Sequence, residues 1–196
     1  MKFSTKEKKD LFFAGIMISL AFAILLSGGL SGILSLSFYV IFVIAFFTAG
    51  IGFLLHELMH KYVAQSYGLF AEFRAYYKML WMALVLSFFG FIIAAPGAVY
   101  IKGNINKEKN GKISIAGPVT NLVLGFLFLI FLLILNPEGI FKAFLGFGLT
   151  INSLLAAFNM IPVLPFDGSK VMAWNKNIYT ITLVLAGGLF ILSWFI

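Results

Sequence analysis

The chain has 196 residues, of which 62% are hydrophobic and only 11% are charged, and its mean hydropathy is +1.05. In soluble domains about a quarter of the residues are charged, so this composition excludes a soluble domain. It predicts a polytopic membrane protein, with residues 1–196 as a single membrane-embedded domain. The net charge of +7 does not indicate nucleic-acid binding, because the lysines form short clusters between apolar segments. Such clusters act as topology signals and contact lipid headgroups.

Apolar segments of about 20 residues, the length of a membrane-spanning helix, recur along the chain. They lie at about residues 11–30, 36–62, 113–135, 140–160 and 178–196. We therefore expect an all-α fold with about five transmembrane helices. The part between the second and third spans is less regular, because a polar segment is followed by an apolar one that Gly90, Pro96 and Gly97 interrupt.

The lysines predict how the spans are oriented. Lys2, Lys6, Lys8 and Lys9 place the N-terminus in the cytoplasm by the positive-inside rule. Residues 79–101 have basic residues on both flanks. This favours a re-entrant element, which could be a β-hairpin, over a further complete span. With re-entry, the connection at residues 161–176 returns to the cytoplasmic side.

The second span carries the sequence H-E-L-M-H near its end, at residues 56–60. Positions four apart share one face of a helix, so His56 and His60 can direct imidazole nitrogens at one metal ion. Glu57 can reach a water on that metal without being a ligand. Two nitrogens, a metal-bound water and a carboxylate that accepts its proton are the parts of a zinc hydrolase.

A catalytic zinc takes three protein ligands, and the chain has no cysteine and no third histidine. The third ligand is therefore a carboxylate, and the candidates are Glu72, Glu108, Glu138 and Asp167. Glu108 lies between lysines in a polar loop, and Glu138 lies in a turn at the opposite face. Asp167 is favoured because it is an acid in an apolar segment at the expected depth of the histidines, and Glu72 is the alternative.

Two prolines precede Asp167. Pro162 and Pro165 break a helix, which lets Asp167 turn toward the second span, and Gly168 permits the next turn. Asn159 precedes the break, and its amide could donate to an oxyanion or form a helix–helix hydrogen bond.

These segments resemble the site-2 protease family of intramembrane zinc metalloproteases. The resemblance rests on the H-E-x-x-H sequence, on A-G-P-V-T-N at residues 116–121, and on N-x-x-P-x-x-P-x-D-G at residues 159–168. Many members read D-G-G-R where this chain has D-G-S-K at residues 167–170. The resemblance implies a catalytic core at about residues 38–172 and an active site inside the membrane near its cytoplasmic face.

The same resemblance implies roles for single residues. It implies His56, His60 and Asp167 as ligands of one zinc ion per chain, Glu57 as the general base and Asn159 near the scissile carbonyl. It also implies membrane-associated β-strands before Gly117, with residues 88–101 as an edge for substrate.

We therefore expect an enzyme of the cell membrane that hydrolyses a peptide bond in the transmembrane segment of a protein substrate. We expect no nucleic-acid partner, and the oligomeric state stays open. One alternative is a membrane metalloprotease for soluble or prenylated substrates, in which Glu72 is the third ligand. Another is a zinc transporter or zinc-binding protein, which does not need Glu57.

Overall fold

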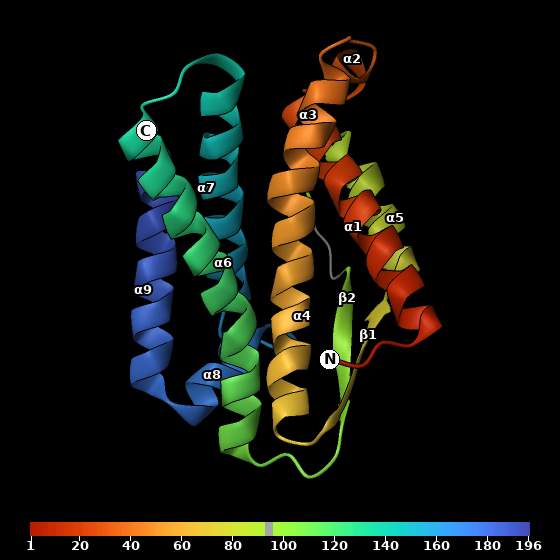
Figure 1. The fold of residues 1–196 in the computed structure, drawn as a ribbon, viewed down its shortest axis with the longest axis vertical. Helices are drawn as coiled ribbons and strands as arrows, with labels where there is room; N and C mark the ends of the chain where they lie inside the picture. The colour runs from red at the N-terminus through yellow and green to blue at the C-terminus, as the bar shows by residue number, and fades with distance from the viewer. Residues whose placement is uncertain (93–95) are drawn as a thin grey trace. The chain divides into compact units, whose positions relative to one another are not determined.

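The computed structural model describes residues 1–92 and 96–196 and is mainly helical (Figure 1). The chain divides into two compact units, one of Lys2–Leu54 with Glu72–Tyr100 and the other of Met1 with Leu55–Ala71 and Ile101–Ile196. The elements in chain order are α1 (Thr5–Leu26), α2 (Leu30–Ile33), α3 (Phe38–Ala45), the π-helical η1 (Phe46–Gly50), α4 (Ile51–Ser66), β1 (Phe70–Ala75), α5 (Tyr77–Ser87), β2 (Gly97–Lys102), α6 (Lys107–Leu135), α7 (Gly139–Asn159), α8 (Asp167–Trp174) and α9 (Lys176–Leu192). The prediction of one domain with its core at residues 38–172 stays a prediction.

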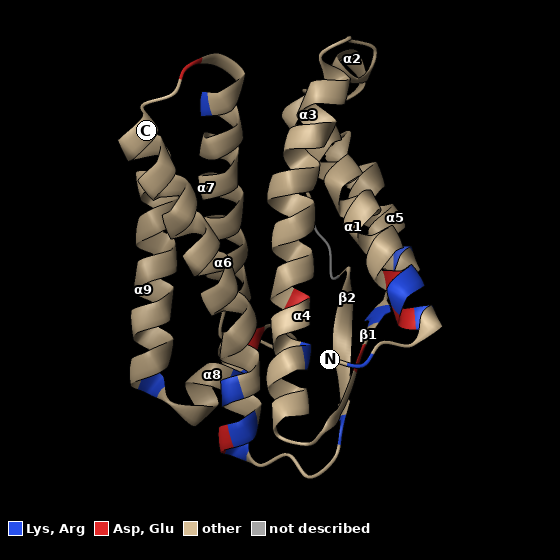
Figure 2. Ribbon diagram, in the orientation of Figure 1, with Lys and Arg blue, Asp and Glu red and all other residues tan. Residues whose placement is uncertain are grey.

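Four helices of the described chain are long and apolar enough to cross a membrane: α1, the continuous helix Phe38–Ser66, α6 and α7. Charged residues gather in the first turns of α1 and of α6, and the rest of each helix carries none (Figure 2). The predicted fifth span forms α9, which has 17 residues. At 1.5 Å per residue it is about 26 Å long, shorter than a hydrocarbon core of about 30 Å. The membrane fold is thus supported, and the fifth span stays a prediction.

In the unit that contains the C-terminus, α6, α7 and α9 lie side by side (Figure 1). Their shared core consists of Leu122, Leu132, Leu145, Leu149, Ala156, Ala186 and Leu189. Helix α8 packs against α6 and α9, with Val171 in contact with Met160 and Tyr179. The sequence analysis expected only an irregular connection at residues 161–176, and α8 is a helix that it missed. Eight residues are too few to produce a clear helical period among prolines and glycines.

In the other unit, α1 packs against α3, η1 and α5. Gly50 in η1 permits the close approach of α1, because a Cβ there would clash with the Ser19 side chain. The π-helical turn ends six positions before His56, the first histidine of the motif.

The two strands form a two-stranded sheet between the second and third spans. The β-structure predicted there is present, but α5 separates the strands, so they do not form a tight hairpin. Helix α5 ends at Ser87, and Gly90 follows with a φ of +87°, a conformation that glycine adopts without strain. The predicted re-entrant path also includes residues 93–95, which lie outside the described residues.

One edge of this sheet is covered by carboxylates from α1. Tyr76 N–H donates to Pro96 O, on the side of β2. Because N–H groups alternate along a strand, those of Phe73 and Ala75 point away from β2. They donate to Glu7 Oε1 at 2.8 Å and to Asp10 Oδ2 at 3.4 Å. The outer edge of β1 therefore has donors that are already bonded.

Candidate metal centre

The two histidines of the motif lie one turn apart on α4. Their ring centroids are 4.7 Å apart, and His56 and His60 are 4% and 7% exposed. Glu57 lies between them in sequence and is 9% exposed. The i, i+4 spacing therefore places two imidazoles and one carboxylate in a largely water-excluded part of the helix.

Asp167 joins the histidines from the start of α8. Its Oδ2 lies 3.4 Å from His56 Nε2 and 3.0 Å from His60 Nε2. Among the residues that the structure describes, His56, His60 and Asp167 form the group that could hold a metal, with ligand atoms within 4.8 Å of one another. The structure thus brings together the three predicted ligands, including the favoured carboxylate.

Two of the separations between these atoms are close to those around a zinc ion. Ligand atoms about 2.0–2.1 Å from a tetrahedral zinc lie roughly 3.3 Å apart, close to the two distances from Asp167 Oδ2. The other oxygen of Asp167, Oδ1, faces Lys170 Nζ at 3.4 Å. Burial by itself would raise the pKa of the Asp167 carboxyl, but the imidazoles of His60 and His56 lower it below its ordinary value. The ionised carboxylate, which this lowering favours, is the form that binds a metal.

A chain of amides determines which nitrogen of His56 carries its hydrogen. Asn152 Nδ2 donates to the Gly148 carbonyl at 2.9 Å, so Asn152 Oδ1 accepts from Asn121 Nδ2 at 3.0 Å. Asn121 Oδ1 then faces His56 Nδ1 at 2.6 Å. Because the chain ends on a carbonyl that can only accept, each amide has one orientation. His56 Nδ1 must donate, which leaves the Nε2 lone pair free for a metal.

His60 is oriented in the same way by a backbone carbonyl. Its Nδ1 lies 2.8 Å from Ile113 O of α6. A carbonyl oxygen can only accept, so Nδ1 carries the hydrogen and Nε2 again faces Asp167. Helix α6 therefore orients both histidines.

Gly117 lets the backbone of α6 approach the imidazoles. A Cβ at this position would lie 2.5 Å from His56 Nε2 and still closer to His60 Nε2. These separations are not far from a zinc–nitrogen bond length of about 2.0–2.1 Å. A side chain here would thus take up space that a metal ion needs.

We expect Gly117→Ala to reduce bound zinc to a small fraction of the wild-type content, measured by elemental analysis of purified protein. Gly187→Ala is the matched control, because it makes the same change in a helix where no atom lies within 4 Å of the new Cβ. Full zinc content in Gly117→Ala would contradict this role of Gly117.

We expect Asn121→Leu to weaken zinc binding by roughly 10- to 100-fold, the usual effect of losing the partner that orients a histidine ligand. The measurement is competition with a chelator of known affinity. Asn121→Asp, which still accepts from His56 Nδ1, should bind more tightly than Asn121→Leu. The control Thr120→Val removes a neighbouring hydroxyl that donates to Ala116 O within its own helix. Equal affinities for Asn121→Leu and wild type would refute the orienting role.

None of the other candidate carboxylates belongs to the metal group, and two of them are paired elsewhere. Glu72 Oε2 pairs with Arg74 Nη2 at 2.6 Å, and Ser4 Oγ donates to Glu72 Oε1. Glu108 pairs with Lys112, and Glu138 is an exposed residue before α7. These contacts agree with the preference for Asp167.

Two further predictions on this segment are refined by the structure. Asn159 Nδ2 donates to Leu155 O at 2.9 Å, so one amide hydrogen is used within its own helix. The catalytic roles of Glu57 and Asn159 stay predictions. Gly168 does not form a turn but lies in the first turn of α8, where a Cβ would clash with Met160 O. Gly168 is therefore needed because it has no side chain, and not because of a positive φ.

The sequence analysis missed Asn152 and gave Asn121 no role. Both side chains are fully buried in helices that are apolar enough to cross a membrane. A polar residue in such a helix is by default a functional hypothesis, and this signal could have identified the pair.

Comparison with known proteins agrees with this centre. The chain is 48% identical over 143 residues to a protein of Methanocaldococcus jannaschii named "Putative zinc metalloprotease MJ0611", with 72% of this chain and 75% of that protein covered. The chain belongs to this zinc metalloprotease family. It is also 30% identical over 140 residues to zinc metalloprotease MJ0392 of the same organism, with 70% of this chain covered. The match spans only 34%, about a third, of that second relative.

No family model matches the chain, and no solved structure matches it significantly. Membership in this family makes zinc the metal that the site is expected to hold. The donor set agrees, because two imidazoles and a carboxylate that leave a position open for water are typical of catalytic zinc.

Proposed function

We propose that this metalloprotease acts within the membrane and hydrolyses a peptide bond in the transmembrane segment of a protein substrate, as the site-2 protease family does. The observation that supports the proposal most strongly is the place of the metal group. His56 and His60 lie in a helix that is long and apolar enough to cross a membrane. We further propose one zinc ion per chain, a cytoplasmic N-terminus and an active site near the cytoplasmic face of the cell membrane.

The residues of the centre have separate tasks in this reaction. When bound, zinc supplies Lewis-acid polarisation of the scissile carbonyl and makes the attacking water more acidic. Glu57 accepts the proton of that water and passes it to the leaving amine. Asn159, with one amide hydrogen bonded to Leu155 O, has a second to offer to the oxygen of the scissile carbonyl.

A substrate helix must unwind before hydrolysis, because its amides are paired and its backbone is shielded. Addition to a sheet edge would hold the unwound segment extended. The outer edge of β1 is bonded to Glu7 and Asp10. We therefore assign the substrate to the edge of β2, within the region that the resemblance implies.

Val99 tests this assignment. Pro96 O points toward β1, so by alternation the backbone groups of Ala98 and Tyr100 also point there, and those of Val99 point outward. We expect Val99→Pro, which removes an outward donor while sparing the ladder with β1, to lower kcat/KM by roughly 3- to 10-fold, the equivalent of about one hydrogen bond. Cleavage rates in detergent provide the measurement.

Val99→Ala keeps the N–H and should cleave like wild type. Zinc content should be unchanged in both variants, because neither touches the metal ligands. A wild-type cleavage rate for Val99→Pro would show that the edge of β2 does not bind the substrate.

The proposed function is tested by reconstituting the protein in liposomes with fusion proteins that carry different transmembrane segments. We expect a cut inside a transmembrane segment, located by mass spectrometry, that stops when zinc is chelated and resumes when zinc is restored. Cuts only in soluble or tail segments would contradict intramembrane cleavage. Zinc flux without any proteolysis would contradict the enzymatic function and favour a transporter.

A further inference from the structure

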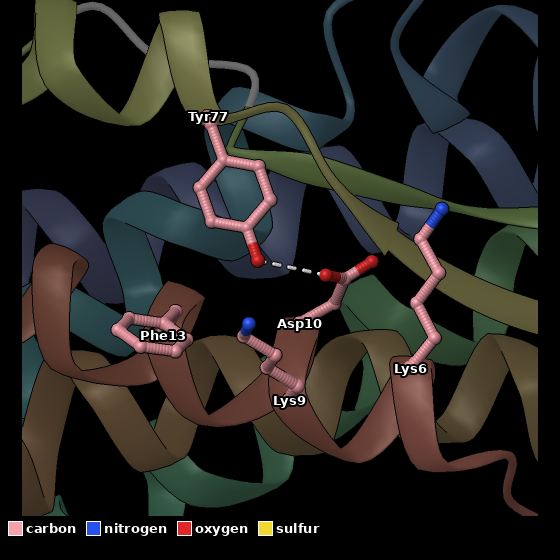
Figure 3. A pocket seen from close by; sticks show the side chains of 5 residues that line it. All are labelled: Lys6, Lys9, Asp10, Phe13 and Tyr77. Carbon is pink, nitrogen blue, oxygen red and sulfur yellow. Dashed lines mark hydrogen bonds between the residues drawn. The ribbon is translucent and has the colours of Figure 1, made fainter.

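A cavity that none of the metal ligands lines lies in the unit that contains α1. It has a volume of about 530 Å³ and is lined by Lys6, Lys9, Asp10, Phe13 and Tyr77 (Figure 3). The first four residues come from the first turns of α1, and Tyr77 begins α5. None of them has a part in the chemistry described above.

The polar side of this cavity is positive. Lys6 and Lys9 are three residues apart, so both side chains project from one side of α1, and their ammonium groups lie on opposite sides of Asp10 (Figure 3). Asp10 is the acidic residue of the lining, and both its oxygens are engaged: Oδ1 accepts from Tyr77 O–H at 2.8 Å and Oδ2 from Ala75 N–H at 3.4 Å. Its charge is therefore directed into the fold.

The two lysines have hydrogen-bonding capacity to offer a ligand. Within residues 1–92 and 96–196, neither ammonium group has a carboxylate within ion-pair distance. Lys9 Nζ lies 5.9 Å from the centroid of the Phe13 ring. An ammonium group has three donors and no acceptor, so the pair suits an anion with several oxygens, such as a phosphate.

The other side of the cavity is apolar. Phe13 and Tyr77 meet edge to face with ring centroids 6.4 Å apart, and Phe13 is 40% exposed. From Leu11 onward α1 carries no charge and has the hydropathy of a membrane span. The cavity therefore lies where the polar first turns of α1 meet its apolar part, the depth at which lipid phosphates lie.

From the lysine pair, the engaged carboxylate and the aromatic wall, we infer that this cavity binds the phosphate headgroup of an anionic membrane lipid, with an acyl chain along Phe13. Basic pockets at the membrane surface recognise lipid headgroups in this way. Tyr77 and Asp10 shape the site by their hydrogen bond, and the lysines supply the charge. The inference depends on a membrane location but not on the proteolytic function.

The test measures lipid binding by native mass spectrometry of the purified protein in a neutral detergent. The probes are phosphatidylglycerol, phosphatidylcholine and inorganic phosphate. We expect wild type to retain one phosphatidylglycerol in preference to phosphatidylcholine. The double variant Lys6→Gln/Lys9→Gln should bind it roughly 10- to 30-fold more weakly, the effect of removing two lysines from a headgroup site.

Lys8→Gln/Lys78→Gln is the matched control, because it removes the same charge from exposed residues nearby that do not line the cavity. It should bind phosphatidylglycerol like wild type, and both double variants should keep their zinc. An equal loss in the control, or equal retention of phosphatidylcholine, would overturn the site. Displacement of the lipid by millimolar phosphate would show a site for the free anion and overturn the assignment to a lipid.

Discussion

Glu57→Gln is expected to abolish peptide hydrolysis while the protein keeps its zinc. The amide preserves the shape of the side chain but cannot accept the proton of the attacking water. Loss of a general base lowers the rate by roughly 10²- to 10⁴-fold. Glu57 lies outside the group of metal ligands, so His56, His60 and Asp167 should hold the ion unchanged.

The measurement is the single-turnover cleavage rate of the same transmembrane substrate, beside zinc content by elemental analysis. Glu138→Gln makes the same acid-to-amide exchange at an exposed residue before α7 and should retain both properties. Turnover near the wild-type rate in Glu57→Gln would refute the role of the base. Loss of zinc together with activity would instead make Glu57 part of the metal site.

Asp167→Ala is expected to remove zinc from the purified protein. The change deletes one of three ligands and leaves two neutral imidazoles, which hold the ion far more weakly. Since loss of a residue that merely orients a ligand costs roughly 10- to 100-fold in affinity, loss of the ligand itself should cost at least roughly 100-fold. The measurement is bound zinc per chain after dialysis against a weak chelator.

Glu72→Ala is the informative comparison for this experiment. Glu72 is the alternative carboxylate, and the structure pairs it with Arg74 and Ser4. The Glu72→Ala variant should therefore keep its zinc. If Glu72→Ala loses zinc and Asp167→Ala keeps it, the third ligand is misassigned, and the metalloprotease for soluble or prenylated substrates becomes the better interpretation.

The two predictions separate binding from chemistry. One variant should lose the metal, and the other should keep it and lose catalysis. A transporter does not require Glu57, so zinc flux that survives Glu57→Gln in liposomes would favour transport over hydrolysis.

Local sequence patterns were sufficient to predict the metal-binding face of α4 and the long apolar helices. Helix periodicity alone places His56 and His60 on one face, because residues four apart always meet there. The absence of cysteine and of a third histidine left a carboxylate as the third ligand. Hydropathy located the four long apolar helices, because a bilayer demands about 20 apolar residues whatever the rest of the fold does.

The boundaries between elements were harder to predict. The apolar run at residues 79–101 became a helix of 11 residues and a strand of six, and α8 appeared in a segment expected to be irregular. Short apolar segments suit either a helix or a strand, and neighbours decide between them. Hydropathy also did not predict where α9 ends, because the apolar sequence continues past Leu192.

The sequence by itself therefore indicated the membrane class and the H-E-x-x-H metal-binding pattern, which depend on composition and on residues within one element. It also favoured Asp167, from a separate segment, as the third ligand. The tertiary structure alone decided how α6 serves the histidines: the chain from Asn152 through Asn121 to His56, and the close approach that Gly117 permits. It also decided that Glu7 and Asp10 cover one edge of the sheet. These contacts join residues 31 to 66 positions apart, and no periodicity encodes such pairs, because they arise only when separate elements pack.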